Sequence, residues 1–275
     1  MMPVVTTNTA ANSALRYLNT NSEAESSSVS KIASGSRITK ASDDAAGLAV
    51  GTKIQSDVTM LNQASTNASN GQSILQAADG GMARISDILQ RMESLATESV
   101  SGTVTDTERG YIDAEYQQLT DEVDSISTGT RFNSQSLLDG TGSWSSGVTF
   151  LVGTATTDTI TITLTTVDSS SLGLTGSSVS TSDGATSAIT TIKSAISALS
   201  TARAKVGAQI SRFEYQGEMI STSIENQEAA QSAIMDVDVA SEQTKLSNED
   251  TLVQAGINAL AKANQLPSEL LKLLQ

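Results

Sequence analysis

The residue types that most enzymes use as nucleophiles and general bases are scarce in this sequence. Its 275 residues include no histidine and no cysteine, which excludes imidazole bases, thiolate nucleophiles, disulfides and metal sites built on nitrogen or sulfur ligands. Ser28-Val29-Ser30-Lys31 has the Ser-x-x-Lys spacing of some acyl-enzymes, but the Ser-Asp-Asn and Lys-Thr-Gly motifs that accompany it are missing. In so serine-rich a chain we attribute this match to chance.

Two pairs of acidic residues could either bind a cation or stabilise the N-terminus of a helix. Asp236-Val237-Asp238 could open a calcium loop, but the glycine and the terminal glutamate of such a loop are missing. Asp43-Asp44 follow Ser42, and we interpret the three as an N-cap serine with two first-turn carboxylates facing the helix dipole. No phosphate-binding glycine motif is present. We therefore predict no catalytic, cofactor-binding or metal-binding residues and no enzymatic activity.

Charge and composition narrow the choice of partners. The chain has 16 Lys and Arg against 30 Asp and Glu, a formal net charge of −14. This balance argues against nucleic acid and against anionic membranes, and no run of 18 apolar residues could span a bilayer. Only 3% of the residues are aromatic, which favours a long thin bundle over a large globular core.

The longest periodic segment runs from residue 189 to residue 234. Alternate steps of three and four residues meet apolar side chains almost throughout, and no proline interrupts them. This is the heptad pattern of a long helix that lies along another helix. A second such pattern covers residues 50–96, and a shorter one runs from Ile112 to Ile126. We predict a mainly α, elongated coiled-coil bundle.

The segment between these helices has a different composition. Residues 141–187 are rich in glycine, serine and threonine, and two stretches alternate strictly between apolar and polar residues. Such alternation predicts a small β-hairpin around residues 148–165, with its turn near Gly153–Asp158. Gly80-Gly81, inside the helix expected at 50–96, predicts a kink or a close helix crossing.

The two ends of the chain are expected to form helices only against a partner. Residues 1–41 carry few apolar side chains, and in residues 240–275 a weak heptad is followed by Pro267, which we expect to interrupt the helix, and by a cluster of leucines. We predict that these ends bind neighbouring copies through their apolar residues: Leu15, Leu18, Val29, Ile32, Leu246, Val253, Ile257, Leu260, Leu270, Leu271 and Leu274.

Several motifs resemble those of bacterial flagellins. They include Lys31–Ile38, Ala41–Ala49, Thr130–Asn133, Arg203–Gln209 and Asp236–Glu242, together with the close at Ala263–Pro267, and they span about 200 of the 275 residues. Ser36 stands where the family usually has leucine, and Thr39 where it usually has asparagine.

The resemblance implies a subunit of the flagellar filament, a homo-polymer, with paired terminal helices and no cofactor. We expect an assembly domain of residues 1–42 and 236–275, and a rod domain of residues 43–235. The implied partners are other subunits, hook-associated and cap proteins, and an export chaperone at the C-terminal region. The first residues lack the charged and apolar regions of a secretory signal peptide, so we expect export to the extracellular flagellum without cleavage.

Three alternatives stay open at this stage. The first is a hook–filament junction protein of the same superfamily, and the second is a secreted adhesin that uses the threonine-rich hairpin. The third, an enzyme, is disfavoured by the missing histidine and cysteine. Separately from these alternatives, the resemblance implies a recognition patch for an innate receptor at Arg91, Leu95 and Glu115.

Overall fold

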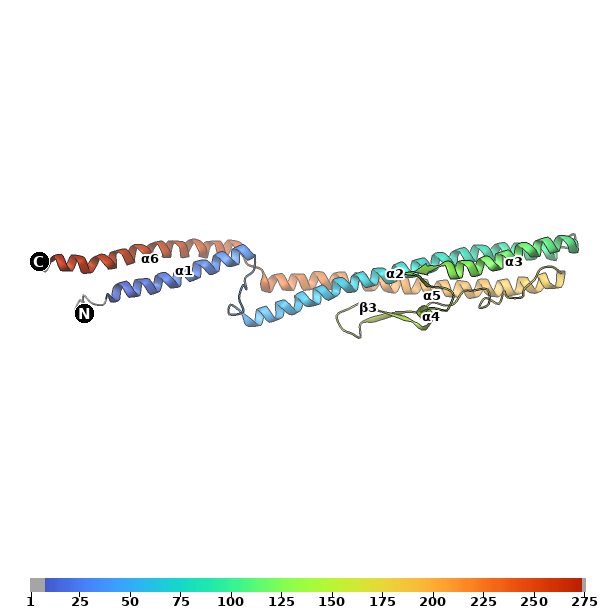
Figure 1. The fold of residues 1–275 in the computed structure, drawn as a ribbon, viewed down its shortest axis with the longest axis horizontal. Coiled ribbons are helices and arrows are strands. Elements are labelled where there is room, and N and C mark those ends of the chain that lie inside the picture. The colour runs from blue at the N-terminus through green and yellow to red at the C-terminus, as the bar shows by residue number, and fades with distance from the viewer. Residues whose placement is uncertain (1–7, 274–275) are drawn as a thin grey trace. The chain divides into compact units, whose positions relative to one another are not determined.

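The computed structural model describes residues 8–273, and within them the side chains of residues 8–265. The chain divides into two units, a terminal unit of residues 1–56 and 226–275 and a central unit of residues 57–225. Two long helices, α2 (Ala45–Val100) and α5 (Ser182–Met235), contribute residues to both units. The terminal unit also contains α1 (Thr9–Ser34) and α6 (Val239–Leu273), which lie side by side (Figure 1).

The central unit is built on the two long heptad patterns. Two buried positions recur every seven residues along α2: Leu61, Ala64, Ala68, Gly71, Leu75, Ala78, Met82, Ile85, Leu89, Met92 and Ala96. In α5 a buried position recurs every seven residues from Ile192 through Leu199, Val206 and Phe213 to Ile220. Both predicted helices are therefore confirmed. The pattern on α2 was extended too far toward its start, because Val50 is 49% exposed.

The third helix, α3 (Asp106–Gly129), starts at the capping box that its sequence predicts. The Thr105 side chain accepts from the Glu108 backbone N–H, and the Glu108 carboxylate accepts from the Thr105 backbone N–H. Tyr116 and Val123 on this helix are fully buried. Where α3 ends, Thr130 and Leu138 lie so close to Gly81 of α2 that a Cβ there would be 2.5 Å from the Thr130 hydroxyl oxygen. Gly81 therefore marks a close approach of α2 to the end of α3 and the loop after it, rather than the predicted crossing of two helices.

The predicted hairpin is present. β3 (Val148–Leu151) pairs antiparallel with β4 (Thr159–Ile162), so that Val148 lies opposite Ile162. Side-chain amides of the long helices hold its end: Asn67 Nδ2 donates to the Leu151 carbonyl and Gln216 Nε2 to the Val152 carbonyl, each at 3.0 Å. A second, shorter hairpin that the sequence analysis missed joins β1 (Arg131–Phe132) to β2 (Gln135–Ser136), and α4 (Ser143–Ser146) follows it.

Residues 163–181 form a strap without regular secondary structure that α3 holds in place. Asp124 accepts from the Ser169 backbone N–H at 2.8 Å and from its hydroxyl at 2.7 Å, and Asp113 accepts from the Val179 N–H at 2.7 Å. Both carboxylates lie on α3, so hydrogen bonds to this one helix fix the strap at Ser169 and at Val179. Its apolar residues complete the core: Leu164, Val167, Leu172, Leu174 and Val179.

Two predicted helix boundaries were wrong. The carboxylate of Asp44, not the hydroxyl of Ser42, accepts the Gly47 backbone N–H at 2.8 Å, while Asp43 accepts the N–H groups of Thr39 and Lys40. Asp44 therefore caps α2, which leaves no acid in its first turn. Pro267 does not end α6, which continues to Leu273. Proline removes one backbone donor, a loss that a long helix survives near its end.

A substitution at Phe213 would test the packing of the central unit. The Phe213 ring lies 2.7 Å from where a Cβ on Gly71 would be, and it meets the Phe150 ring edge-on at 5.9 Å. We expect Phe213→Ala to lower the free energy of unfolding by about 3–5 kcal/mol, because it leaves a cavity between two helices and the hairpin. Denaturant unfolding measures this change. Tyr215→Ala, at a side chain that is 73% exposed, is the control and should change it by less than about 0.5 kcal/mol. Equal losses in both variants would contradict the assigned core.

Candidate assembly interface

The helices α1 and α6 run antiparallel, and three contacts fix their register. Asn8 Nδ2 donates to the Ala263 carbonyl at 2.7 Å, and the Ser28 hydroxyl donates to the Glu242 carboxylate at 3.0 Å. Between them, a Leu18 methyl group lies 3.2 Å from where a Cβ on Gly256 would be. The pairing of the two terminal helices predicted from the sequence is thus confirmed (Figure 1).

A heptad of shielded residues lies between the two helices. On α6 its members are buried or partly buried and recur in steps of four and three: Glu242, Leu246, Glu249, Val253, Gly256, Leu260 and Ala263. On α1 the corresponding positions are Ala11, Ala14, Leu18, Asn21, Glu25, Ser28 and Ile32. Five of the predicted interface residues belong to this seam, which is a contact within one chain: Leu18, Ile32, Leu246, Val253 and Leu260.

The other predicted interface residues with described side chains point to solvent. Leu15, Val29 and Ile257 are 46%, 48% and 54% exposed. Three further exposed apolar residues were not predicted, because they do not follow the heptad: Tyr17, Val239 and Leu252. These six residues are called the exposed apolar set below. Leu270, Leu271 and Leu274 were predicted as well, but they lie outside the described side chains.

The terminal unit has almost no apolar core of its own. The whole hydrophobic core cluster belongs to the central unit, whereas in the described part of the terminal unit only Ile38 and Ala263 are buried apolar side chains. Burying a leucine contributes about 1.5–3 kcal/mol, and ordering one residue's backbone costs about 1–2 kcal/mol. Helices of 26 and 35 residues with so little burial are marginal in an isolated chain, so they need further contacts.

Among the described side chains of the terminal unit, the best-shielded polar contact links Glu242 of α6 to Lys245 of the same helix and to Ser28 of α1. The Glu242 side chain is 6% exposed, and its carboxylate accepts from the Lys245 ammonium at 2.8 Å and from the Ser28 hydroxyl. The hydrogen bond from Lys245, and then that from Ser28, hold the pKa of Glu242 below its ordinary value against the opposing effect of burial. An ionised Glu242 thus links α6 to α1.

A junction of residues 35–38, 51 and 234–237 connects the helices of the terminal unit. Gly35 ends α1 in the left-handed region at φ 69°, where glycine is favoured. The Arg37 backbone N–H donates to the Met235 carbonyl at 2.6 Å, and its guanidinium donates to the Ile234 carbonyl at 2.8 Å. These bonds satisfy carbonyl groups at the end of α5 that have no partner within the helix.

Ser36 has a specific role in this junction. Its hydroxyl lies 3.1 Å from the Met235 carbonyl oxygen and 3.0 Å from the Ile38 carbonyl oxygen. The single hydroxyl proton can be donated to either carbonyl, whereas a leucine, which the resemblance would place here, could donate to neither. The polar residue therefore adds a side-chain donor to the end of α5.

The structure separates the three residues of the predicted receptor patch. Arg91 and Glu115 form an exposed ion pair across α2 and α3, with 2.7 Å between Nη2 and Oε1. Leu95 is only 2% exposed and belongs to the core of the central unit. In this conformation a partner could touch the ion pair but not Leu95.

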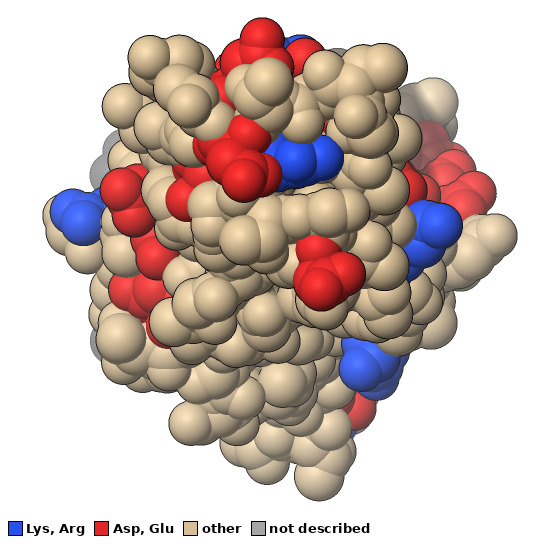
Figure 2. All heavy atoms as spheres, turned by 90° about the vertical axis from the view of Figure 1, so that its right-hand side faces the viewer, with Lys and Arg blue, Asp and Glu red and all other residues tan. Residues whose placement is uncertain are grey.

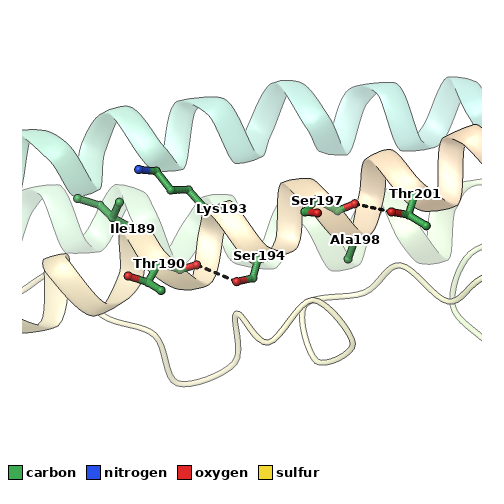
Figure 3. Close-up of a pocket in the computed structure, with 7 residues that line it drawn as sticks. All are labelled: Ile189, Thr190, Lys193, Ser194, Ser197, Ala198 and Thr201. Carbon is green, nitrogen blue, oxygen red and sulfur yellow. Dashed lines mark hydrogen bonds between the residues drawn. The ribbon is translucent and has the colours of Figure 1, made fainter.

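The described surface of α5 carries no ligand site of its own. Figure 3 shows the surface of α5 around Lys193, where the hydroxyls of Ser194 and Thr201 donate to carbonyls of their own helix at 3.0 and 2.9 Å. No polar groups converge there on a ligand. Among the described side chains of residues 8–265, no cluster of acidic groups could hold a metal. Within residues 8–273, no helix is long and apolar enough to cross a membrane. Acidic side chains outnumber basic ones on the face in Figure 2.

Comparison with known proteins gives consistent matches at both ends of the chain. Residues 5–143 match the bacterial flagellin N-terminal helical region, and residues 189–274 match the bacterial flagellin C-terminal helical region. A flagellin of Halalkalibacterium halodurans is 35% identical over 274 residues, which cover 99% of this chain and 100% of that protein. A flagellar filament 30.7 kDa core protein of Treponema maltophilum is 34% identical, over 94% of this chain and 95% of that protein.

Two solved structures resemble the chain. The crystal structure of Bacillus cereus flagellin has a TM-score of 0.51 and 31% identity, and the match covers 60% of this chain and 94% of that one. A putative flagellar hook-associated protein from Vibrio parahaemolyticus has a TM-score of 0.59 over 70% of this chain and all of that one. Its identity is 13%, so this second likeness shows the fold alone.

Glu242 makes the terminal unit sensitive to acid. Because its pKa is lowered in the folded state, its contribution to stability is complete above about pH 4.3, the ordinary glutamate pKa, and is lost as the pH falls from there through the lowered value. We expect the helix content of the terminal unit to fall over this range. Circular dichroism against pH measures it, in the wild type and in Glu242→Gln, whose neutral side chain should remove this component of the transition.

Glu25→Gln is the matched control, because it removes a carboxylate from the seam of α1 without touching the Ser28–Glu242–Lys245 contact. It should keep the wild-type transition at low pH. An acid transition in Glu242→Gln that coincides with that of the wild type would rule out this role for Glu242.

Proposed function

Because the chain belongs to the bacterial flagellin family, we propose that its terminal helices, α1 and α6, are the surfaces through which copies of it join in a filament. The family assigns the broader role: the chain is a structural subunit of the bacterial flagellar filament and not an enzyme. The observation that supports the finer proposal is the exposed apolar set on helices that have almost no core of their own.

A second copy suits these helices physically. Two helices alone shield only the residues between them, so the apolar side chains on their outer sides are covered only when further helices pack against them. The assembly domain of this proposal comprises residues 1–42 and 236–275, and residues 43–235 form the rod that carries it. Of the exposed set, only Val239, Leu252 and Ile257 come from α6, so both terminal helices contribute to the contact.

The alternative roles have weaker support. The likeness to a hook-associated protein rests on the fold at 13% identity, whereas flagellins and filament core proteins match over nearly the whole chain. An adhesin would need a binding surface on the hairpin, whose Thr149 and Thr161 hydroxyls lie 3.2 Å apart and bond to each other. The receptor patch at Arg91 and Glu115 remains a prediction.

We also propose that the chain is exported unfolded, without a cleaved signal, and that a chaperone covers its C-terminal region until then. Two features support this proposal. The chain has no cysteine, so no disulfide prevents threading through a narrow channel, and α6 exposes Leu252 and Ile257, which a chaperone groove could cover. Hook-associated and cap proteins are proposed as partners at the two ends of the filament.

Seeded assembly tests the interface directly. Purified subunits are added to short filament seeds near neutral pH, and growth is followed by negative-stain electron microscopy. We expect Leu15→Gln with Val29→Gln to abolish growth, because they remove apolar area without deleting a contact inside the chain. Asn12→Gln with Asn19→Gln is the matched control on exposed positions of the same helix and should grow like the wild type. Normal growth of the leucine–valine double variant would overturn the proposed interface.

Deletion of residues 240–275 gives an independent test of the same surface. Without α6 we expect monomers that leave the seeds unchanged, while the central unit unfolds with its usual midpoint because its core lies elsewhere. Filaments of normal length from the truncated chain would place the assembly contacts in the central unit instead.

A further inference from the structure

We propose that Met235 is an oxidation site through which peroxides weaken the junction of the terminal unit and so prevent subunits from joining the filament. The inference rests on the proposed assembly function, because its effect is read as filament growth. It depends on where the five described methionines, of the seven in this chain, lie in the structure.

The methionines differ in access and in packing. Met82 and Met92 are fully buried in the core of the central unit, which protects their sulfur atoms. Met60 and Met219 are 39% and 55% exposed, so a peroxide reaches them without disturbing the core. Met235 is partly exposed and also fills a packed position. Among the described methionines it alone combines access with a tight contact.

The packed position is the bare backbone of Gly51 on α2. The Met235 sulfur lies 2.5 Å, and its Cγ 2.8 Å, from the point where a Cβ on Gly51 would be. Gly51 is buried, and the methionine side chain is the cover over it. This contact joins the end of α5 to α2 within the terminal unit.

The main chain of Met235 is held at the same point. It is the last residue of α5, and its carbonyl accepts from the Arg37 N–H at 2.6 Å and from the Ser36 hydroxyl at 3.1 Å. Two residues on, the Val237 N–H donates to the Gly35 carbonyl at 3.1 Å. A displaced Met235 therefore disturbs the link between α5 and the segment that joins α1 to α2.

The chemistry needs only a peroxide. A lone pair of the thioether sulfur attacks one oxygen of hydrogen peroxide, the O–O bond breaks, and water leaves with the second oxygen after proton transfer, so sulfur is oxidised and peroxide reduced. The product is a sulfoxide, which a methionine sulfoxide reductase returns to the thioether. The sulfoxide is polar and carries one more atom, so it fits poorly against the Gly51 backbone. Once it leaves, Gly51 loses its cover.

The experiment compares three proteins treated with hydrogen peroxide as unassembled full-length subunits and then added to untreated seeds. They are the wild type, Met235→Leu, and Met60→Leu with Met219→Leu. Leucine keeps the apolar volume and cannot be oxidised in this way. Peptide mass spectrometry measures the sulfoxide fraction at each methionine, and electron microscopy measures filament growth.

We expect the wild type and the Met60/Met219 double variant to lose growth in proportion to the sulfoxide at residue 235, and reductase treatment to restore it. Met235→Leu should keep its growth at the same dose. Loss of growth in Met235→Leu equal to that in the wild type, or protection by the Met60/Met219 changes instead, would overturn the proposal.

A second measurement applies if untreated Met235→Leu fails to assemble. Partly oxidised wild-type subunits are then allowed to grow on seeds, and polymer and supernatant are analysed separately. The sulfoxide at residue 235 should be enriched in the supernatant, and equal fractions in both would refute its role. If untreated wild type itself does not grow, the assembly proposal has failed and not the oxidation site.

Discussion

A pair of helices can bury only the residues that lie between its two members. In the central unit a third helix, a hairpin and a strap pack against α2 and α5, so that these two helices also bury residues on their other sides. The terminal unit has no such additions among its described residues. Its seam contains alanine, serine, asparagine and glutamate beside the leucines, and the larger apolar side chains are divided between the seam and the solvent-facing sides. A helix pair of this kind needs further packing partners to be stable, and in the proposed assembly neighbouring subunits would supply them.

The long helices were predictable because their signal is repeated many times. Five consecutive heptads on α2 carry the same information, so no single residue decides the outcome, and the exposed Val50 changes little. The capping box of α3 was equally clear, since Thr105 and Glu108 are local neighbours. The cap of α2 was assigned to the wrong residue because Ser42, Asp43 and Asp44 can all accept a backbone N–H, and only the path of the chain selects among them.

Contacts between distant segments set the limit of prediction from sequence. Nothing in the spacing of Asp113 and Asp124 shows that they hold residues 169 and 179, so the strap appeared only as a polar segment. The same holds for the candidate interface. The heptad identified the apolar residues of α1 and α6, but it could not tell Leu18, which faces Gly256, from Leu15, which faces solvent. That distinction depends on the rotation of each helix about its axis, which the partner helix fixes.

The contact between Gly71 and Phe213 has a mechanical consequence. Heptad helices can in principle slide past each other by one repeat, because the next repeat offers a similar surface. Here a slide of one repeat would bring Ala64 or Ala78, the residues seven positions from Gly71, toward the phenylalanine ring, where a Cβ at the present separation would be 2.7 Å from a ring carbon. The pairing of α2 with α5 is therefore free of this steric clash only in the observed register. Under shear along the helix axes, we expect the central unit to deform elastically, without a permanent slip of α2 past α5.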